Sequence, residues 1–561
     1  MTLGERLDVL ARGWRGPVLA ALVALAATLP GLLALPPIDR DEARFAEASA
    51  QMLESGDFID IRFQRTPRDK KPVGIYWLQA AATRVLSPND DRRIWTYRVP
   101  SLVGAMVAAA ACVWGAAAFL RPGAALAAGA MLASSFMLST EAMIASTDAA
   151  LAGAVTAAMA ALARIWISQS GEESERRRPD AWTRFVFWLA LGVSILLKGP
   201  IGPMVVILAA ALLSVWSRQV RWLRPISWVW GLLLLAVLIG PWAMAITVST
   251  DGAFWGKAVG GDLAPKLIGG QEGHGAPPGY YLVLAPLLIF PATLLLPGGL
   301  LAAWRSRLEP GVRFAICWLV PSWIVFEAVP TKLIHYTLPL YGALAWLMAR
   351  ALSEPLSRGA KIVGAILAIL AGFLLAALGP AALASLDFPP PWPWAAAAAV
   401  LALAAAVAGA ALLLRGRPLA ALCASIALAV AGHDLLSAGL APALAPLWLS
   451  QRTAQALASA RESPLGGGAG PVAVAGYAEP SLVFLLGADT VLGSPQDAAD
   501  AIADGDPAIV EKRSETPFEA ALADDEAHAR LIGQVAGLDY SNGRHDILRL
   551  YAPAEEGGSA P

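Results

Sequence analysis

Apolar segments of about twenty residues recur along the chain, and they constrain its fold more than any other feature. The first begins near Pro17 and the last ends near Leu440. A helix of this length is long enough to cross the hydrocarbon core of a bilayer. The composition agrees, since 57% of the residues are hydrophobic and only 15% are charged. The sequence therefore predicts a polytopic α-helical membrane protein.

We expect about thirteen spans, because each segment is long enough for one helix. They are 17–37, 99–120, 123–141, 147–167, 184–198, 200–217, 226–248, 280–303, 312–330, 334–350, 361–380, 394–414 and 418–440. Alternate loops between them are basic, with the sequences "ERRRP", "RQVRWLR", "WRSR" and "RGR". Cytoplasmic loops carry the excess of Lys and Arg, so the amino terminus is predicted inside and the chain after Leu440 outside.

One predicted outer loop, residues 38–98, breaks this pattern because it is strongly charged. It carries "DRDEAR" at one end and "RDKKP" at the other. Between and after these clusters, Ala43–Ser55 and Val73–Leu86 each have apolar residues along one side. This pattern is typical of amphipathic helices at a membrane surface. The loop is therefore expected to fold back and to hold its charges at the mouths of the spans.

Other charged residues fall at the same predicted level of the membrane. Asp148 begins one span, Lys198 ends another, and Lys332 precedes His335 and Tyr336 at the start of a third. A charge within a span costs about 2.5–3.5 kcal/mol on insertion scales, so such residues usually face a cavity. Acids and lysines that converge on one cavity suit a negatively charged lipid phosphate beside a catalytic carboxylate.

The two ends of the chain differ in kind. Residues 1–445 are expected to form the membrane region, with a second outer loop at 249–279. Residues 446–561 are expected to form a small outer α/β domain with short strand-like runs.

Neither GxxxxGK[ST] nor GxGxxG occurs in a strand–turn–helix setting, which argues against an ATP-driven pump or an enzyme that uses a sugar nucleotide. No nucleic-acid partner is indicated.

Ordered motifs along the membrane region resemble a known family. They include "DEARFAEASAQMLESGDF" (41–58), "KPVGIYWLQA" (71–80), "KGPIG" (198–202) and "TKLIHYTLPLY" (331–341). The chain is similar to the bacterial lipid A aminoarabinose transferases and, more distantly, to the protein O-mannosyltransferases. This resemblance implies a GT-C fold in the bacterial inner membrane, with a polyprenyl-phosphate sugar donor and transfer with inversion on the periplasmic face.

The resemblance also implies roles for individual residues. Asp41 matches the catalytic acid, and Lys71 matches the lysine at the donor phosphate. Arg44, Lys198 and Lys332 are expected as further cations at that phosphate. Asp148, the second predicted catalytic acid, is expected in the same cavity, together with Glu42, Tyr76, His335 and Tyr336.

At one position the chain departs from the family. The aminoarabinose transferases carry Glu directly before the Lys-Pro of the second surface helix and pair it with a later His to hold a metal. Here that position is Lys70, and the approximate match to the His is Asp262. We therefore expect a Lys70–Asp262 ion pair between the two outer loops and no metal or other cofactor. His274 is the alternative metal ligand.

Two other functions remain open at this level. A transporter or flippase for a lipid-linked sugar explains the intramembrane charges, and an envelope assembly protein explains the outer domain. The motifs specify neither the sugar nor the acceptor, which could be lipid A, another glycolipid, a polysaccharide or a protein. The oligomeric state is also unspecified.

Overall fold

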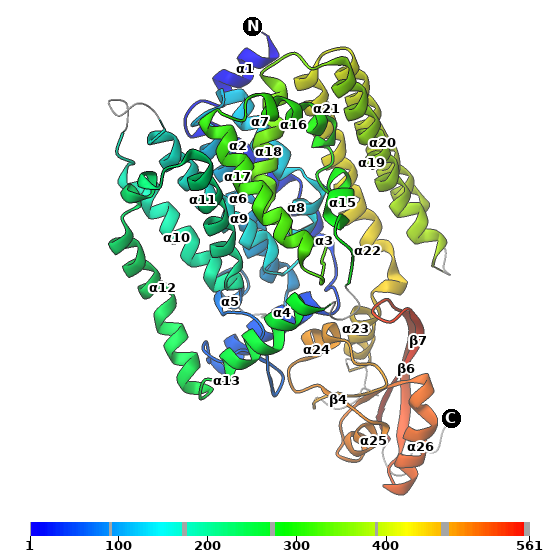
Figure 1. Cartoon of the computed structure of the whole chain (residues 1–561). Coiled ribbons are helices and arrows are strands. Elements are labelled where there is room, and N and C mark those ends of the chain that lie inside the picture. The colour runs from blue at the N-terminus through cyan, green and yellow to red at the C-terminus, as the bar shows by residue number, and fades with distance from the viewer. Residues whose placement is uncertain are drawn as a thin grey trace.

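The computed structural model describes residues 2–88, 92–170, 177–269, 275–386, 391–461 and 470–554, except for the side chains of residues 262, 263, 267 and 268. A bundle of long helices forms the larger part, and the C-terminal residues form a smaller body at one end of it (Figure 1). We call this end of the bundle the domain side.

Among the described residues, nine helices are long and apolar enough to cross a membrane. They are α2–α3 (Arg15–Ala34), α6 (Ile94–Ala116), α9 (Asp148–Ser168), α10 (Ala181–Lys198), α12 (Trp228–Ser249), α17 (Pro310–Ala328), α19 (Arg358–Ala384), α20 (Trp392–Leu414) and α21–α22 (Pro418–Ala443). A tenth possible span is the pair Tyr280–Leu288 and Ala292–Arg305, which is bent by 112°.

Three shorter apolar helices complete the bundle: α7 (Pro122–Ala133), α11 (Ile201–Ser217) and the segment Leu338–Leu352 that contains α18 (Tyr341–Ala349). Each of the thirteen predicted spans therefore coincides with one of these helices, although three are shorter than a full span and one is bent. The protein is a multi-pass helical membrane protein, as predicted.

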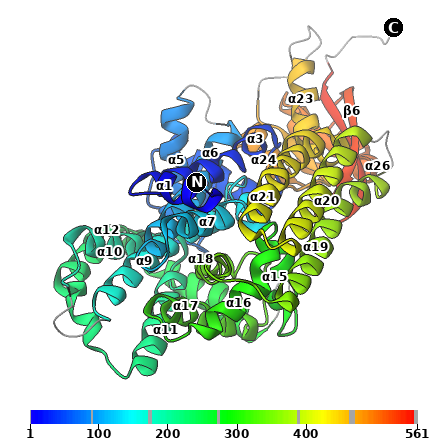
Figure 2. The same cartoon turned by 90° about the horizontal axis from the view of Figure 1, so that it is seen from above.

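Helix α9 lies beside α10, and α18 stands between it and the group α19–α21 on the other side of the bundle (Figure 2). Within its most apolar window, 89% of the residues are buried. Its close packing on α6 depends on small residues, because a Cβ at Gly104 would lie 2.4 Å from Ala150 Cα and one at Gly153 would lie 2.4 Å from Gly104 O. Small residues allow helices in a membrane to approach closely. This packing fixes Asp148, the first residue of α9.

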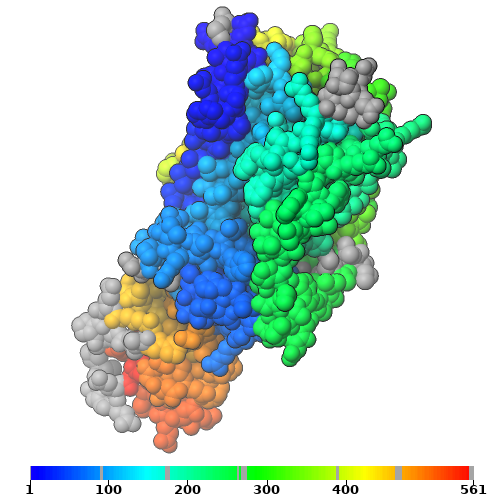
Figure 3. Space-filling model, turned by 90° about the vertical axis from the view of Figure 1, so that its left-hand side faces the viewer, coloured from blue at the N-terminus to red at the C-terminus, as the bar shows by residue number. Residues whose placement is uncertain are grey.

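Two amphipathic helices cover the domain side, as predicted: α4 (Asp41–Ser55) and α5 (Gly74–Leu86). A two-stranded hairpin of β1 (Arg62–Phe63) and β2 (Thr66–Pro67) lies between them in the chain. The apolar face of α4 is buried, but it packs on protein, since α4 contacts both α5 and helix α24 (Pro480–Leu486) of the C-terminal domain. In the space-filling view this blue segment lies beside the orange C-terminal body (Figure 3).

The C-terminal body is an α/β domain, which confirms the predicted class. Its sheet has the order β4-β3-β5-β7-β6, with β3 parallel to β4 and β5 and with β7 antiparallel to β5 and β6. The strands are β3 (Ala473–Ala475), β4 (Val491–Gly493), β5 (Ala508–Glu511), β6 (Ala529–Asp539) and β7 (Arg544–Pro553). Helices α25 (Pro495–Ala503) and α26 (Glu515–Asp524) contribute to one apolar cluster, and α23 (Leu449–Arg461) and α24 to another.

The remaining elements are short. They are α1 (Leu3–Leu10), α8 (Phe136–Glu141), η1 (Arg221–Ile226), α13 (Ala253–Trp255), η2 (Gly256–Leu263), α14 (Ala264–Ile268) and the 3-10 turns of the chain, of which η3 is Ala292–Leu295 and η7 is Ala445–Leu447. Of these, α13, η2 and α14 form the second loop of the domain side and contribute residues to the site.

Candidate functional site

A pocket of about 1150 Å³ lies at the domain side of the bundle, and we call it the inner pocket. One part of its lining is charged, with Lys70, Lys71, Asp148, Lys198 and Lys266. Its other lining residues are mainly apolar: Pro72, Leu151, Pro200, Ile201, Met204, Phe254, Trp255, Ala258, Val259, Val325, Phe326, Val329 and Pro339, with Gly199 and Tyr336. The pocket thus combines cations with a long hydrocarbon surface.

Asp148 and Lys198 form an ion pair in this pocket, with Lys198 Nζ 2.5 Å from Asp148 Oδ1. Asp148 begins α9, where the free amides and the dipole of the helix favour a negative charge. Lys198 ends α10, and Gly199 follows it with a φ of 59° that a residue with a side chain rarely adopts. The Lys198 ammonium also lies 5.2 Å from the centre of the Tyr336 ring. Three separate segments therefore converge on one charged centre.

His335 joins this centre to a second carboxylate. Its Nε2 lies 3.6 Å from Asp148 Oδ2, and its Nδ1 lies 3.3 Å from Glu141 Oε1. Burial lowers the pKa of His335, but the negative charges of Asp148 and Glu141 outweigh burial and raise the pKa above its ordinary value. The side chain is thus stabilised as an imidazolium between two carboxylates.

Glu141, Asp148 and His335 are also, among the residues that the structure describes, a group of three whose ligand atoms lie within 4.8 Å of one another. The two nitrogens of His335 face different carboxylates, and the Lys198 ammonium already occupies one oxygen of Asp148. A metal ion would stand beside that ammonium and be repelled by its positive charge, so the donor set fits an ion network better than a resident cation.

A second cleft, which we call the basic cleft, adjoins the inner pocket through their common residue Lys70. It has about 890 Å³ of space and is lined by Arg44, Phe63, Thr66, Pro67, Arg68, Asp69, Lys257 and Gly261 besides Lys70. Four of these residues carry a positive charge and one a negative charge. The cleft therefore presents a net positive surface beside the pocket.

Asp41 lies at this cleft through its two arginine neighbours. The distance from Asp41 Oδ1 is 3.9 Å to Arg44 Nη1 and 3.7 Å to Arg68 Nη2. The Asp41 side chain is 73% exposed, so its carboxylate is open to a reactant from solvent. Arg68 is held in turn by Tyr76, whose hydroxyl accepts from Arg68 Nε at 3.3 Å, and by Phe45, whose ring centre lies 5.0 Å from the guanidinium carbon.

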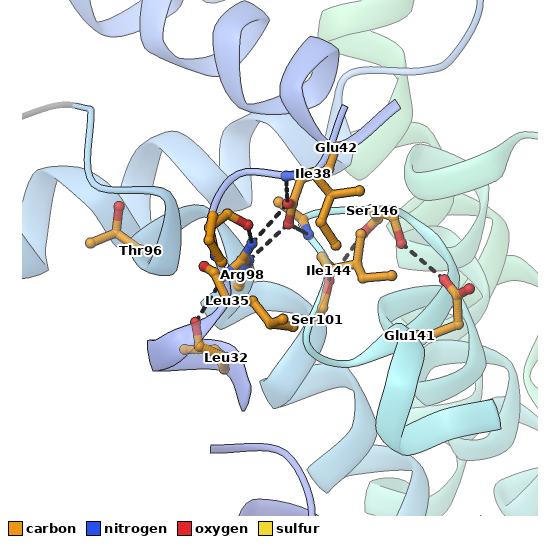
Figure 4. Close-up of polar contacts among 12 residues, drawn as sticks. Leu32, Leu35, Ile38, Glu42, Thr96, Arg98, Ser101, Glu141, Ile144 and Ser146 are labelled. Atoms are coloured by element: carbon orange, nitrogen blue, oxygen red, sulfur yellow. Dashed lines mark hydrogen bonds and ion pairs between the residues drawn. The ribbon is translucent and has the colours of Figure 1, made fainter. Parts of the chain in front are cut away.

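The structure corrects the expectation that Glu42 lines the cavity. Glu42 is buried, and both of its oxygens accept hydrogen bonds from Arg98 at 2.8 Å. It also accepts from the amides of Ile38 at 2.8 Å and Ala145 at 2.7 Å (Figure 4). Arg98 donates further to backbone carbonyls at the end of the first span. Glu42 therefore joins the first span, α4, α6 and the loop before α9.

Lys332 is a second correction. Its ammonium is buried and donates to the carbonyl oxygens of Phe326, Glu327 and Val329 at 3.3, 2.8 and 2.5 Å. These carbonyls are at or after the end of α17, where a helix lacks internal partners for its oxygens. Lys332 thus caps a helix and does not line the inner pocket. Tyr76 is likewise absent from the pocket lining, and its hydroxyl accepts from Arg68 of the basic cleft.

The expected Lys70–Asp262 pair stays a prediction, because the side chain of Asp262 lies outside the described residues, as does all of His274. The same two loops are joined next to Lys70 by an ion pair between Asp69 Oδ2 and Lys257 Nζ at 2.9 Å. The two loops are therefore joined by an ion pair whose partners are other residues than the two in that prediction.

Four residues of this region were missed by the sequence reasoning: Arg68, Lys266, Glu141 and Arg98. Arg68 and Lys266 belong to charged outer loops, so their charge was visible but their direction was not. Glu141 ends the short helix α8 inside a segment that was predicted as part of a span. The signal that could have found Glu141 and Arg98 is that each is a charged residue in an otherwise apolar stretch.

These features define the class of the protein: it has the GT-C fold of membrane glycosyltransferases. A family model described as dolichyl-phosphate-mannose-protein mannosyltransferase matches residues 40–253. The crystal structure of ArnT from Cupriavidus metallidurans bound to undecaprenyl phosphate superposes with a TM-score of 0.72, at 19% identity, over 95% of this chain and 97% of that chain. The archaeal oligosaccharyltransferase from Archaeoglobus fulgidus shares the fold at a TM-score of 0.51 and 12% identity, over 96% of this chain and 74% of that chain.

The particular similarity is to the aminoarabinose transferases. The chain is 28% identical over 318 residues to the undecaprenyl phosphate-alpha-4-amino-4-deoxy-L-arabinose arabinosyl transferase of Pseudomonas paraeruginosa, which is 56% of each chain. It is 26% identical over 329 residues to the enzyme of the same name from Erwinia tasmaniensis, covering 58% of this chain and 56% of that enzyme. The matches thus span just over half the length of these relatives. The resemblance predicted from the sequence is confirmed.

Proposed function

We propose that the protein is an inverting glycosyltransferase that takes a sugar from an undecaprenyl phosphate donor. The observation that carries this proposal is the inner pocket, where Lys71, Lys198 and Lys266 stand beside a long apolar lining. A sugar phosphate with a polyprenyl tail has the matching chemistry: an anionic phosphate and a large hydrocarbon surface. The names of the relatives, which are undecaprenyl-phosphate-dependent arabinosyl transferases, support the same donor.

In the proposed reaction an acceptor oxygen attacks the anomeric carbon of the sugar. The bond from that carbon to the phosphate oxygen breaks, and undecaprenyl phosphate leaves with the bonding electrons. Because attack and departure occur on opposite faces of the carbon, the anomeric configuration inverts. Negative charge builds up on the departing phosphate, and cations that are already in place stabilise it without reorganisation. We assign this role to Lys71, with Lys198 and Lys266 beside it.

Asp41 is proposed to take the proton of the acceptor hydroxyl, or to orient an acceptor phosphate, as the nucleophile attacks. Its carboxylate is exposed and lies 3.9 Å from Arg44 Nη1 and 3.7 Å from Arg68 Nη2, so it stands beside the cations of the basic cleft. Asp148 is proposed to orient Lys198 through their 2.5 Å contact and to hold His335 as its second partner. Activation of the acceptor is thus assigned to the basic cleft, and binding of the donor phosphate to the inner pocket.

The basic cleft favours an anionic acceptor. Arg44, Arg68, Lys70 and Lys257 line it, and the two arginines lie 3.9 and 3.7 Å from the Asp41 carboxylate. Cations of this kind bind phosphate or carboxylate groups. A phosphorylated glycolipid, such as lipid A, has this chemistry and approaches from the membrane. We propose this acceptor class over a neutral polysaccharide or a neutral protein segment.

We propose that the protein lies in the bacterial inner membrane with its amino terminus in the cytoplasm and its C-terminal domain in the periplasm. Helices α9, α11 and Leu296–Arg305 (α16) end away from the domain side, and a basic sequence comes at or after the end of each, which supports this orientation. The transporter or flippase alternative is not favoured, since the named relatives are transferases.

The experiment is transfer by purified protein in nanodiscs, followed by mass spectrometry of the lipids. Candidate undecaprenyl phosphate sugars are supplied with lipid A, with dephosphorylated lipid A or with a neutral glycolipid. The proposal expects a mass increase of one sugar on phosphorylated lipid A and little on its dephosphorylated form. Equal transfer to the dephosphorylated form would contradict the anionic acceptor, and no transfer from any donor would contradict the function.

A further inference from the structure

The residue directly before Asp41 has an unusual backbone. Arg40 has φ 66° and ψ −107°, which lies outside the small left-handed region open to residues with a side chain. Conformations of this kind persist only where the surroundings determine them, and they cluster at functional sites. The conformation of Arg40 sets the direction in which the chain enters α4, and Asp41 is the first residue of that helix.

Three hydrogen bonds join this segment to the C-terminal domain. The amide of Asp39 donates to the hydroxyl of Tyr540 at 2.7 Å, and Arg40 Nη2 donates to the carbonyl of Ser541 at 2.5 Å. The Asp39 carboxylate accepts from the amide of Ser481 at 3.1 Å. These three bonds hold the two residues before Asp41, and their partners lie about 440–500 positions away in the sequence.

The partner turn is itself held in shape. Tyr540 and Ser541 belong to the turn between β6 and β7, where the Asp539 carboxylate accepts from the Ser541 amide at 3.0 Å and from Asn542 Nδ2 at 2.6 Å. The Tyr540 ring meets Trp448 at 6.5 Å between ring centres, in an edge-to-face arrangement. The turn therefore presents a fixed hydroxyl and a fixed carbonyl to the strained segment.

We propose that the C-terminal domain positions the proposed catalytic carboxylate, with the β6–β7 turn holding Arg40 in its strained conformation so that Asp41 faces the basic cleft. This inference rests on the proposed function. Tyr540 and Ser541 are positioning residues, since they contact the segment before Asp41 and lie outside the lining of the inner pocket and of the basic cleft. Without their bonds Arg40 relaxes toward a negative φ, and the first turn of α4 reorients.

The substitution Tyr540→Phe tests this directly, because it removes the accepting hydroxyl and keeps the ring against Trp448. Amide exchange of peptides covering residues 38–44 is measured together with kcat and the KM for donor. We expect faster exchange and a fall in kcat of roughly 10- to 100-fold with an unchanged KM, since small displacements of a reacting group carry losses of that size. The control Tyr551→Phe removes a hydroxyl that bonds Glu515 far from the junction, and should change neither quantity.

A second variant separates positioning from simple docking. Glycine adopts the Arg40 conformation without steric cost, so in an Arg40→Gly background the effect of Tyr540→Phe on kcat should shrink to less than about two-fold. A domain that only docks would give the same effect in both backgrounds. Unchanged exchange in Tyr540→Phe, or faster exchange with unchanged kcat, overturns the inference. A wild-type protein without transfer activity overturns the proposed function instead, and the positioning role with it.

Discussion

Replacing Lys71 by Met is expected to weaken binding of undecaprenyl phosphate by about ten-fold. A hydrogen bond to a charged group contributes about 1.5–3 kcal/mol, which corresponds to roughly 10- to 150-fold in affinity. Lys198 and Lys266 line the same pocket and remain in the variant, so the lower end of this range applies. Met keeps most of the apolar stem of Lys, and the variant therefore isolates the charge.

The assay is titration of undecaprenyl phosphate into protein in nanodiscs at low and high salt. Lys332→Met serves as a matched control, because the Lys332 ammonium caps the end of α17 and lies outside the pocket. This control should lower the unfolding temperature and leave donor affinity unchanged. Lys361→Met, near the start of α19 and outside the pocket lining, should change neither the unfolding temperature nor the donor affinity. Equal affinity in Lys71→Met and wild type, or a larger loss in Lys332→Met, would refute the assignment of the phosphate site.

Asp41→Asn should reduce turnover by about 10²–10⁴-fold while donor affinity stays constant, and retention of more than about a tenth of the rate in a single-turnover assay would contradict its role. Arg98→Met leaves the buried Glu42 carboxylate without its partner and should cost about 3–5 kcal/mol of unfolding free energy, partly recovered by adding Glu42→Gln. Burial raises the pKa of Asp39 to about 6 and that of Glu479 to about 7. Both pKa values lie above the ordinary pKa of a carboxyl group. The two groups therefore stabilise the docked junction fully below about pH 4, and this stabilisation is lost as the pH rises through 6 to 7. The unfolding temperature should accordingly be higher at pH 5.5 than at pH 8, and the double variant Asp39→Asn, Glu479→Gln should lose that difference. Chelation should leave transfer unchanged, and stoichiometric bound zinc with chelator-sensitive transfer would contradict the expected absence of a metal.

The sequence predicted the membrane region well because the signal is physical and local. A helix needs a fixed length of apolar residues to cross a bilayer, and each predicted span coincides with a helix of the bundle. The sharp bend between Tyr280–Leu288 and Ala292–Arg305 was not predicted, since an apolar run has the same composition whether it is straight or bent by 112°. The convergence of Asp148, Lys198 and Tyr336 followed from their shared level in the membrane.

Side-chain direction was the part that the sequence could not supply. Lys198 and Lys332 both stand at span ends, yet one meets Asp148 in the pocket and the other turns back onto the carbonyls of its own neighbourhood. Asp41 and Glu42 are adjacent, and only the helical turn decides that the first is exposed and the second reaches Arg98. The contact of the C-terminal domain with Arg40 depends on tertiary docking across the whole chain, and no local pattern encodes it.

The central claim is sugar transfer, and the most direct measurement follows the donor in proteoliposomes with a labelled sugar. The account predicts that wild-type protein releases undecaprenyl phosphate and labelled acceptor in equal amounts, with inverted anomeric configuration, and that Asp41→Asn releases neither. Movement of intact labelled donor from one leaflet to the other, without consumption of donor and with no labelled acceptor, would contradict the account and support a flippase.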